Sequence, residues 1–164
     1  MIRKVVGDAL TGRTFNNSLD LGCGFGDGGA LVKPHTVYLI GVDLDPSALS
    51  EAKHRGVYDE FHEGDMKNYP WGSADSVFLF DTIEHISKEE GKELLRKLRG
   101  RFTMLTTPWH SLSLLSPWGA WDGHRCVWSS EELQGEGFTT EGYSFLPDPF
   151  MVLQYGGITL AVRE

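Results

Sequence analysis

The stretch Ser18-Leu19-Asp20-Leu21-Gly22-Cys23-Gly24-Phe25-Gly26 decides the fold of this chain. A short apolar run leads through an acidic residue directly into a cluster of glycines. Glycine adopts positive φ freely and lets a ligand approach the backbone. Ligands of open α/β sheets bind beyond the carboxyl ends of the strands. The stretch therefore predicts a strand that ends in a binding loop at the edge of an α/β sheet.

Further short apolar runs along the chain resemble buried strands. They cover residues 36–43, 57–63, 76–81 and 102–107. Near-continuous apolar runs are typical of parallel strands that are covered on both faces. Two late runs, near 137–145 and 151–162, have no long helix between them, and Pro147-Asp148-Pro149 fits their connection. These two runs predict an antiparallel strand pair.

Helix signals separate the strands. Asp45 stands before a proline, a pair typical of a helix start. Ser87 and Glu90 form a capping box, and Ser129 opens a further short helix. A glycine-rich helix near 26–33 is expected to be only a turn or two long. The alternation predicts a single domain over residues 1–164, an α/β protein built as a three-layer α/β/α sandwich, with a mostly parallel sheet and an antiparallel end.

Composition limits the classes of function. The 164 residues suit one domain, and 15 basic against 23 acidic residues give a net charge of −8. That charge argues against a nucleic-acid partner, which would require a basic face. Two cysteines without a CxxC pair indicate a reducing compartment. No apolar run approaches the roughly 18 residues of a membrane span. We therefore expect a cytoplasmic protein that has no membrane partner.

The charges around the glycine loop distinguish between possible ligands. A pyrophosphate binds the N–H groups of a helix start and is repelled by nearby carboxylates. Asp20 and Asp27 flank the loop, and no lysine or arginine lies between Arg13 and Lys33. An acidic loop suits a cationic ligand, and S-adenosylmethionine carries a sulfonium and an ammonium group. The dinucleotide fingerprint GxGxxG is nevertheless matched by Gly24, Gly26 and Gly29.

Two more acidic residues follow later strands. Asp43 ends the second strand, where a carboxylate can accept two hydrogen bonds from a ribose diol. Gly64-Asp65-Met66 follows the third strand, where a carboxylate and a backbone N–H could bind an adenine. Asp43 serves NAD and S-adenosylmethionine equally well. A plain turn remains the alternative interpretation of the Gly64-Asp65 pair.

Together these blocks resemble the class I S-adenosylmethionine-dependent methyltransferases, and in particular their small-molecule branch. The matching blocks are Leu19 to Gly26, Gly41 to Asp45, Gly64-Asp65, and Phe80-Asp81-Thr82-Ile83-Glu84-His85-Ile86. Their order and spacing agree with the family over roughly residues 18–107. The resemblance implies a Rossmann-like, seven-stranded sheet whose last strand is antiparallel.

The resemblance also implies residue roles. The methionine part of the cofactor would be held by Asp20, Gly22, Cys23, Gly24, Gly26 and Asp81, the ribose by Asp43, and the adenine by Leu44, Asp65 and Met66. Asp81-Thr82-Ile83-Glu84 stands where enzymes that methylate the amino groups of nucleic-acid bases carry Asn/Asp-Pro-Pro-Tyr. This departure favours a small-molecule or side-chain acceptor.

A base is needed only where the acceptor must lose a proton. The candidate bases are His85, His110 and His124, because histidine titrates near neutrality. No HxH or HxxxH spacing with acids occurs, so no metal is expected. The aromatic segment 109–128 predicts a long loop. Long loops are often functional, and the alternative interpretation is a hydrophobic cluster that covers the sheet. The tryptophans of this segment suggest an apolar or aromatic acceptor.

Three functions remain open from the sequence. The first is a methyltransferase that acts on a small molecule or a protein side chain by in-line methyl transfer. The second is a non-catalytic subunit that binds S-adenosylmethionine. The third is an NAD-dependent reductase, against which the acidic loop argues.

Overall fold

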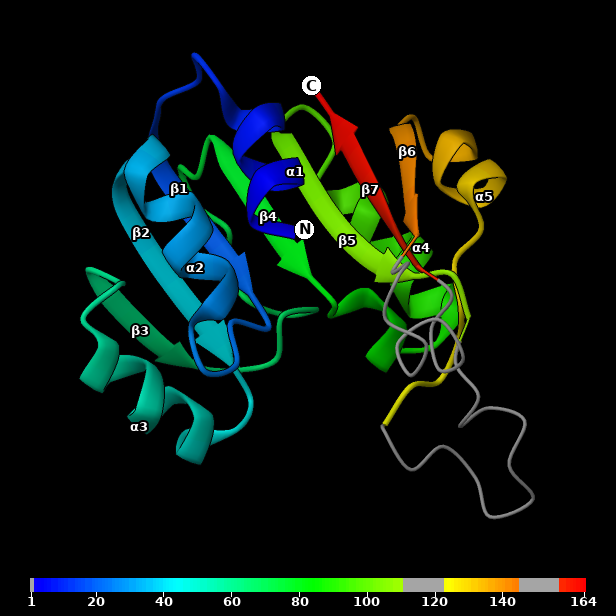
Figure 1. Cartoon of the computed structure of the whole chain (residues 1–164). Helices are drawn as coiled ribbons and strands as arrows, with labels where there is room; N and C mark the ends of the chain where they lie inside the picture. Colours follow the sequence, from blue (N-terminus) through cyan, green and yellow to red (C-terminus); the bar gives the residue numbers. More distant parts are fainter. Residues whose placement is uncertain (1, 111–122, 145–156) are drawn as a thin grey trace. The chain divides into compact units, whose positions relative to one another are not determined.

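The computed structural model describes residues 2–110, 123–144 and 157–164 (Figure 1). The chain splits into two compact units, the first formed by Met1–Phe80 with Arg101–Thr103 and the second by Asp81–Gly100 with Met104–Glu164. The expectation of a single domain over 1–164 stays a prediction. The helices are α1 (Ile2–Leu10), α2 (Asp27–Val32), α3 (Pro46–Arg55), α4 (Lys88–Lys97) and α5 (Ser130–Gly135), with short 3-10 turns η1 (Lys33–His35) and η2 (Ile83–His85). The strands are β1 (Phe15–Leu21), β2 (Thr36–Asp43), β3 (Glu60–Glu63), β4 (Ser76–Phe80), β5 (Phe102–Pro108), β6 (Thr139–Ser144) and β7 (Gly157–Arg163).

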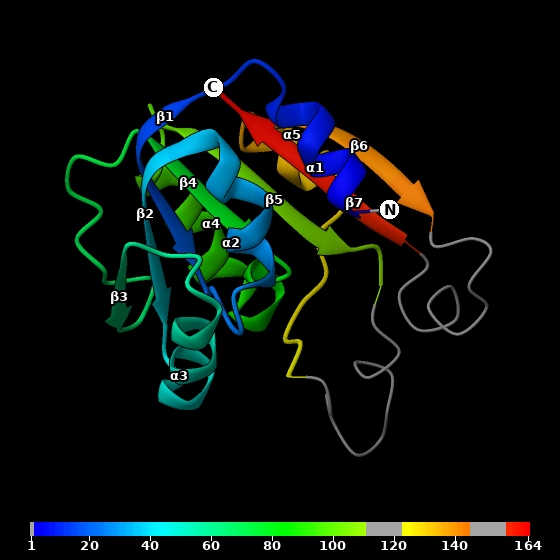
Figure 2. The ribbon, with the colours of Figure 1, turned by 60° about the vertical axis from the view of Figure 1, so that its left-hand side comes forward.

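The strands form one seven-stranded sheet in the order β3-β2-β1-β4-β5-β7-β6 (Figures 1 and 2). Strand β1 pairs in parallel with β2 and β4, and β2 pairs in parallel with β3. Strands β6 and β7 pair antiparallel. The mixed sheet flanked by helices confirms the expected α/β sandwich and its antiparallel end. The predicted connection at Pro147-Asp148-Pro149 lies outside the described residues.

The first unit is organised around β1. Ser18 on this buried strand joins its hydroxyl to those of Thr36 and Ser76, each at 2.7 Å, so hydrogen bonds satisfy polar groups inside the sheet. Helix α2 spans six residues, as expected for its glycine-rich sequence. A Cβ at Gly28 would lie 2.5 Å from the ring of Phe80, so the glycine lets α2 approach β4 closely.

Helix α1 was not predicted from the sequence. It buries Val5, Val6 and Leu10 along one side and contacts α2. No capping motif marks its start, and Gly7 in its interior weakens its intrinsic propensity by about 1 kcal/mol relative to alanine. Packing of the apolar side against α2 stabilises this helix where local signals are weak.

The predicted helix starts are confirmed. Asp45 caps α3 by accepting a hydrogen bond from the backbone N–H of Ser47 at 2.8 Å. Ser87 forms a capping box at the start of α4, and Ser129 forms another at the start of α5. Such caps can be predicted from the sequence, because every backbone N–H group that they satisfy lies within three residues of the cap. Among the described residues, no helix is both long and apolar enough to cross a membrane.

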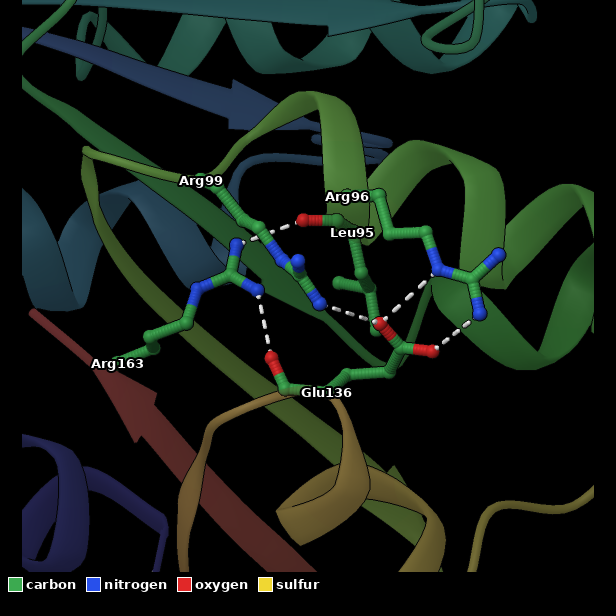
Figure 3. A network of polar contacts seen from close by, with 5 residues as sticks. All are labelled: Leu95, Arg96, Arg99, Glu136 and Arg163. Atoms are coloured by element: carbon green, nitrogen blue, oxygen red, sulfur yellow. Dashed lines mark hydrogen bonds and ion pairs between the residues drawn. The ribbon is translucent and has the colours of Figure 1, made fainter.

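The second unit contains a network of arginines around Glu136 (Figure 3). Arg163 on β7 is buried and donates to the backbone carbonyls of Leu95 at 2.7 Å and Glu136 at 2.9 Å. The buried Glu136 carboxylate accepts from Arg96 at 3.0 Å and from Arg99 at 3.4 Å. The network therefore connects β7, the end of α4 and the turn after α5.

Candidate functional site

The glycine loop after β1 has the backbone conformation that its sequence predicts. Gly22, Gly24 and Gly26 have φ values of +71°, +49° and +90°, which lie in the region that favours glycine. The backbone N–H groups of Gly22 and Cys23 both donate to the carbonyl of Val42, at 2.8 and 3.0 Å. The loop is therefore fixed against the carboxyl end of β2.

Asp43 connects the glycine loop to the start of α3. Its carboxylate accepts the N–H of Gly24 at 2.8 Å and the N–H of Asp45 at 2.9 Å. An ionised carboxylate has about four lone-pair sites, so two such bonds leave acceptor capacity for a ligand. The neighbouring Leu44 is 64% exposed and Phe25 on the loop is 56% exposed. Exposed apolar side chains beside a polar acceptor suit a ligand with one apolar and one hydrogen-bonding part.

Asp20 lies beneath this loop and is fully buried. The hydroxyl of Tyr58 donates to its carboxylate at 2.7 Å. Burial raises the pKa of Asp20 to about 7, although the bond from Tyr58 acts in the opposite direction. A Cβ at Gly29 would lie 2.3 Å from the Tyr58 hydroxyl, so this glycine provides the space that the tyrosine occupies. Sequence reasoning missed Tyr58, which stands in no recognisable motif.

The structure corrects the argument from loop charge. Asp27 pairs with Arg55 at the end of α3, with 2.5 Å between Nη1 and Oδ1. The interval without cations between Arg13 and Lys33 therefore overstated the negative charge, because the fold brings a guanidinium from another helix. Because the pKa of Asp20 is about 7, its carboxyl group is only partly ionised at neutral pH. An electrostatic preference of the loop for a cationic ligand therefore depends mainly on Asp43.

Asp65 and Met66 follow β3 beside Asp43. The N–H of Gly64 donates to the backbone carbonyl of Asp43 at 2.9 Å, which joins the ends of β2 and β3. The Asp65 carboxylate accepts the N–H of Lys67 at 2.9 Å, an Asx turn, and Met66 is buried. The structure therefore contains the turn that was the alternative interpretation. This turn places Asp65 and Met66 at the edge of the sheet where the glycine loop also lies.

In the second unit, Asp81 has an unusual backbone conformation. Its φ of +48° makes it the one non-glycine residue of the described chain in the left-handed region. Its N–H donates to the carbonyl of Thr106 at 3.0 Å, and the Thr106 hydroxyl donates to its carboxylate at 2.9 Å. Loss of solvation raises the pKa of Asp81, while Thr106, His124 and His85 oppose the rise. Strained residues of this kind cluster at functional sites.

Two of the three candidate histidines come together in this unit. The rings of His85 and His124 lie 4.8 Å apart at an interplanar angle of 76°. His85 is exposed and His124 is buried. Glu84, fully buried, lies close enough that one ligand atom from each of the three residues falls within 4.8 Å of the others. Sequence spacing does not reveal this cluster, because His124 lies about forty residues after the adjacent pair Glu84 and His85.

The third candidate, His110, lies two residues after the end of β5 and is half-buried. It is not a member of the cluster of Glu84, His85 and His124. Most of the aromatic segment 109–128 lies outside the described residues, so its predicted loop and its proposed contact with an acceptor stay predictions.

Comparison with known proteins agrees with this arrangement. A family model described as "Methyltransferase domain" matches residues 19–102, about half of the chain. Among curated proteins, no sequence matches significantly. Solved structures share the fold at low identity. Magnesium protoporphyrin IX methyltransferase from Synechocystis, crystallised with S-adenosylhomocysteine, is 19% identical with a TM-score of 0.69, over 99% of this chain and 83% of that one.

Two other similar structures are named for different activities. The [4+2]-cyclase SpnF is 17% identical with a TM-score of 0.70, over 99% of this chain and 80% of that one. The small RNA methyltransferase HEN1 is 16% identical with a TM-score of 0.67, over 100% of this chain and 25% of that one. At these identities the structures establish the fold and leave the acceptor open. The family match, together with the glycine loop and the sheet order, shows that the chain belongs to the class I methyltransferases, the family whose cofactor is S-adenosylmethionine.

Proposed function

We propose that this chain transfers the methyl group of S-adenosylmethionine to a small molecule or a protein side chain by in-line displacement. The observation that carries the proposal is the carboxylate of Asp43, which holds Gly24 of the loop and retains free acceptor capacity beside the exposed Leu44. A diol-binding acid next to an apolar surface fits an adenosine.

The cofactor would lie along the carboxyl ends of β1, β2 and β3. Asp43 would accept the ribose hydroxyls, Leu44 and Met66 would contact the adenine, and Asp65 would accept from its amino group. The loop residues Gly22, Cys23, Gly24 and Gly26 would approach the methionine part with their backbone, and Asp20 would lie beneath them.

The chemistry of the reaction requires little from the protein. When bound, S-adenosylmethionine supplies both the methyl group and its own leaving group. The protein aligns the acceptor and excludes water, which converts the transfer into an effectively intramolecular step. A histidine is needed only for acceptors that must lose a proton, and His85, His110 and His124 are the candidates.

The proposed class of methyl acceptor rests on the net charge of the chain and on the residues that follow β4. A net charge of −8 is unfavourable for a nucleic-acid partner. The Asp81-Thr82-Ile83-Glu84 sequence differs from the motif of the base-amino methyltransferases, so we place nucleic-acid bases outside the proposed acceptors.

Calorimetric titration with S-adenosylhomocysteine and with NADH tests the cofactor site. We expect the first ligand to bind and the second not to. Asp43→Ala should lower affinity by at least about tenfold, because a hydrogen bond to a charged group contributes about 1.5–3 kcal/mol. Asp59→Ala is the matched control. Its carboxylate accepts the N–H of Leu39, nearer the other end of β2, at 2.7 Å. Tighter binding of NADH would refute the proposal.

Methyl transfer itself requires a separate measurement. The chain is incubated with methyl-labelled S-adenosylmethionine and a metabolite extract, and label is followed into small molecules and protein. Labelled product supports the enzyme. Binding of S-adenosylhomocysteine without any labelled product would favour a non-catalytic binding subunit.

A further inference from the structure

The cluster of Glu84, His85 and His124 in the second unit has a donor set that the cofactor site does not use. Glu84 and His85 lie on the 3-10 turn η2, and His124 comes from the segment before α5. One ligand atom from each residue lies within 4.8 Å of the others. Two imidazoles and one carboxylate converge at one point of the fold.

Backbone hydrogen bonds hold this convergence in place. The N–H groups of Arg125 and Cys126 both donate to the carbonyl of Glu84, at 2.8 and 3.3 Å. These bonds attach the segment that carries His124 to the residue that precedes His85. The two histidines therefore lie near one another because backbone hydrogen bonds hold their two segments together.

The surroundings leave room at the exposed histidine. Gly123 has a φ of +78°, and a Cβ there would lie 3.3 Å from Nδ1 of His85. A larger residue at this position would crowd the imidazole. His85 is exposed, while Glu84 and His124 are buried. The cluster thus has two interior groups and one side that faces solvent.

The chemistry of the donors selects the class of ion. Ligands around zinc lie about 2.0–2.2 Å from the metal, so two of them are separated by about 3–4 Å, and small rotamer changes within 4.8 Å suffice. Magnesium and calcium prefer oxygen ligands, whereas imidazole favours first-row transition ions. Two imidazoles and one carboxylate are a known ligand set of catalytic zinc sites.

We propose that Glu84, His85 and His124 bind one divalent first-row transition-metal ion, with a coordination position left open on the side of His85. On this assignment His85 and His124 act as ligands and not as bases, and His110 remains the candidate base. The open position would accept a further lone-pair donor. The proposal concerns the second unit alone and does not depend on the binding of S-adenosylmethionine.

Cobalt(II) is the probe, because its visible absorption reports nitrogen and oxygen ligation. The full chain is treated with EDTA, desalted and titrated with Co²⁺ in the absence of S-adenosylmethionine. We expect one Co²⁺ per chain, displaced by Zn²⁺ and not by Mg²⁺. Removal of a group that only orients a ligand costs about 10–100-fold in metal affinity, so loss of a ligand in His85→Gln should cost at least about 100-fold.

His62→Gln is the matched control, because His62 also lies beside a carboxylate, 2.8 Å from Glu60, on the surface of the first unit. It should leave Co²⁺ binding unchanged. His85 is exposed, so His85→Gln should retain the fold, and thermal unfolding without metal verifies this. His124→Gln gives the second ligand test.

Three results would overturn the assignment. The first is absence of Co²⁺ and Zn²⁺ binding at millimolar concentration, which would leave a metal-free histidine–glutamate cluster. The second is binding that His85→Gln does not weaken. The third is displacement of Co²⁺ by Mg²⁺, which would indicate an oxygen site elsewhere. None of these results bears on binding of S-adenosylhomocysteine, so the two proposals fail separately.

Discussion

Replacement of Asp20 by asparagine should change how the stability of this protein depends on pH. The folded protein raises the pKa of Asp20 from 3.8 to about 7, with burial as the main cause. Between these values the folded state holds a proton that the unfolded state has released. The free energy of unfolding that Asp20 contributes therefore falls as pH rises through this window, and levels off above about pH 7.

The magnitude follows from the size of the shift. One pKa unit corresponds to about 1.4 kcal/mol. A rise from 3.8 to about 7 therefore corresponds to a loss of about 4 kcal/mol across the window. Asparagine does not titrate and still offers an oxygen to the Tyr58 hydroxyl. Asp20→Asn should therefore gain stability relative to the wild type as pH rises, at up to about 1.4 kcal/mol per pH unit.

Urea unfolding followed by tryptophan fluorescence measures this difference. Wild type and Asp20→Asn are compared from pH 4.5 to pH 8 without cofactor, and equal urea dependence verifies that both unfold alike. Asp27→Asn removes a negative charge from the surface of the same loop and is the control for a simple charge effect. A stability difference that stays constant within about 0.5 kcal/mol across this range would refute the reasoning.

Three further predictions concern stability, each measured by urea unfolding. Gly29→Ala places a Cβ 2.3 Å from the buried Tyr58 and should lower the free energy of unfolding by about 1–3 kcal/mol. Its control, Gly7→Ala, meets nothing within 4 Å and should stabilise α1 by about 0.5–1 kcal/mol. Equal effects of the two substitutions would contradict the proposed packing. Ser87→Ala removes the cap of α4 and should cost about 1 kcal/mol, and an unchanged midpoint would show that the cap is dispensable. Arg163→Met leaves two carbonyl groups without their donor and should cost about 1–3 kcal/mol for each group that stays buried, which a neutral substitution would disprove.

The sequence alone determined the features that depend on neighbouring residues. The glycines after β1 need positive φ, and the caps at Asp45, Ser87 and Ser129 satisfy N–H groups within three residues. The apolar runs predicted the strands, because continuous hydrophobicity marks burial on both faces. Four blocks in the right order were sufficient to indicate the family.

Only the tertiary structure decided which side chains from distant segments meet. It buried Asp20, which raises the pKa of its carboxyl, and it paired Asp27 with Arg55, so the loop is less acidic than its own sequence suggests. It also assembled Glu84 and His85 with His124, a set that no local spacing reveals. Strands, turns and caps follow from short-range sterics and hydrogen bonding, whereas the charge of a loop and the donors of a site depend on the packing that brings remote residues together.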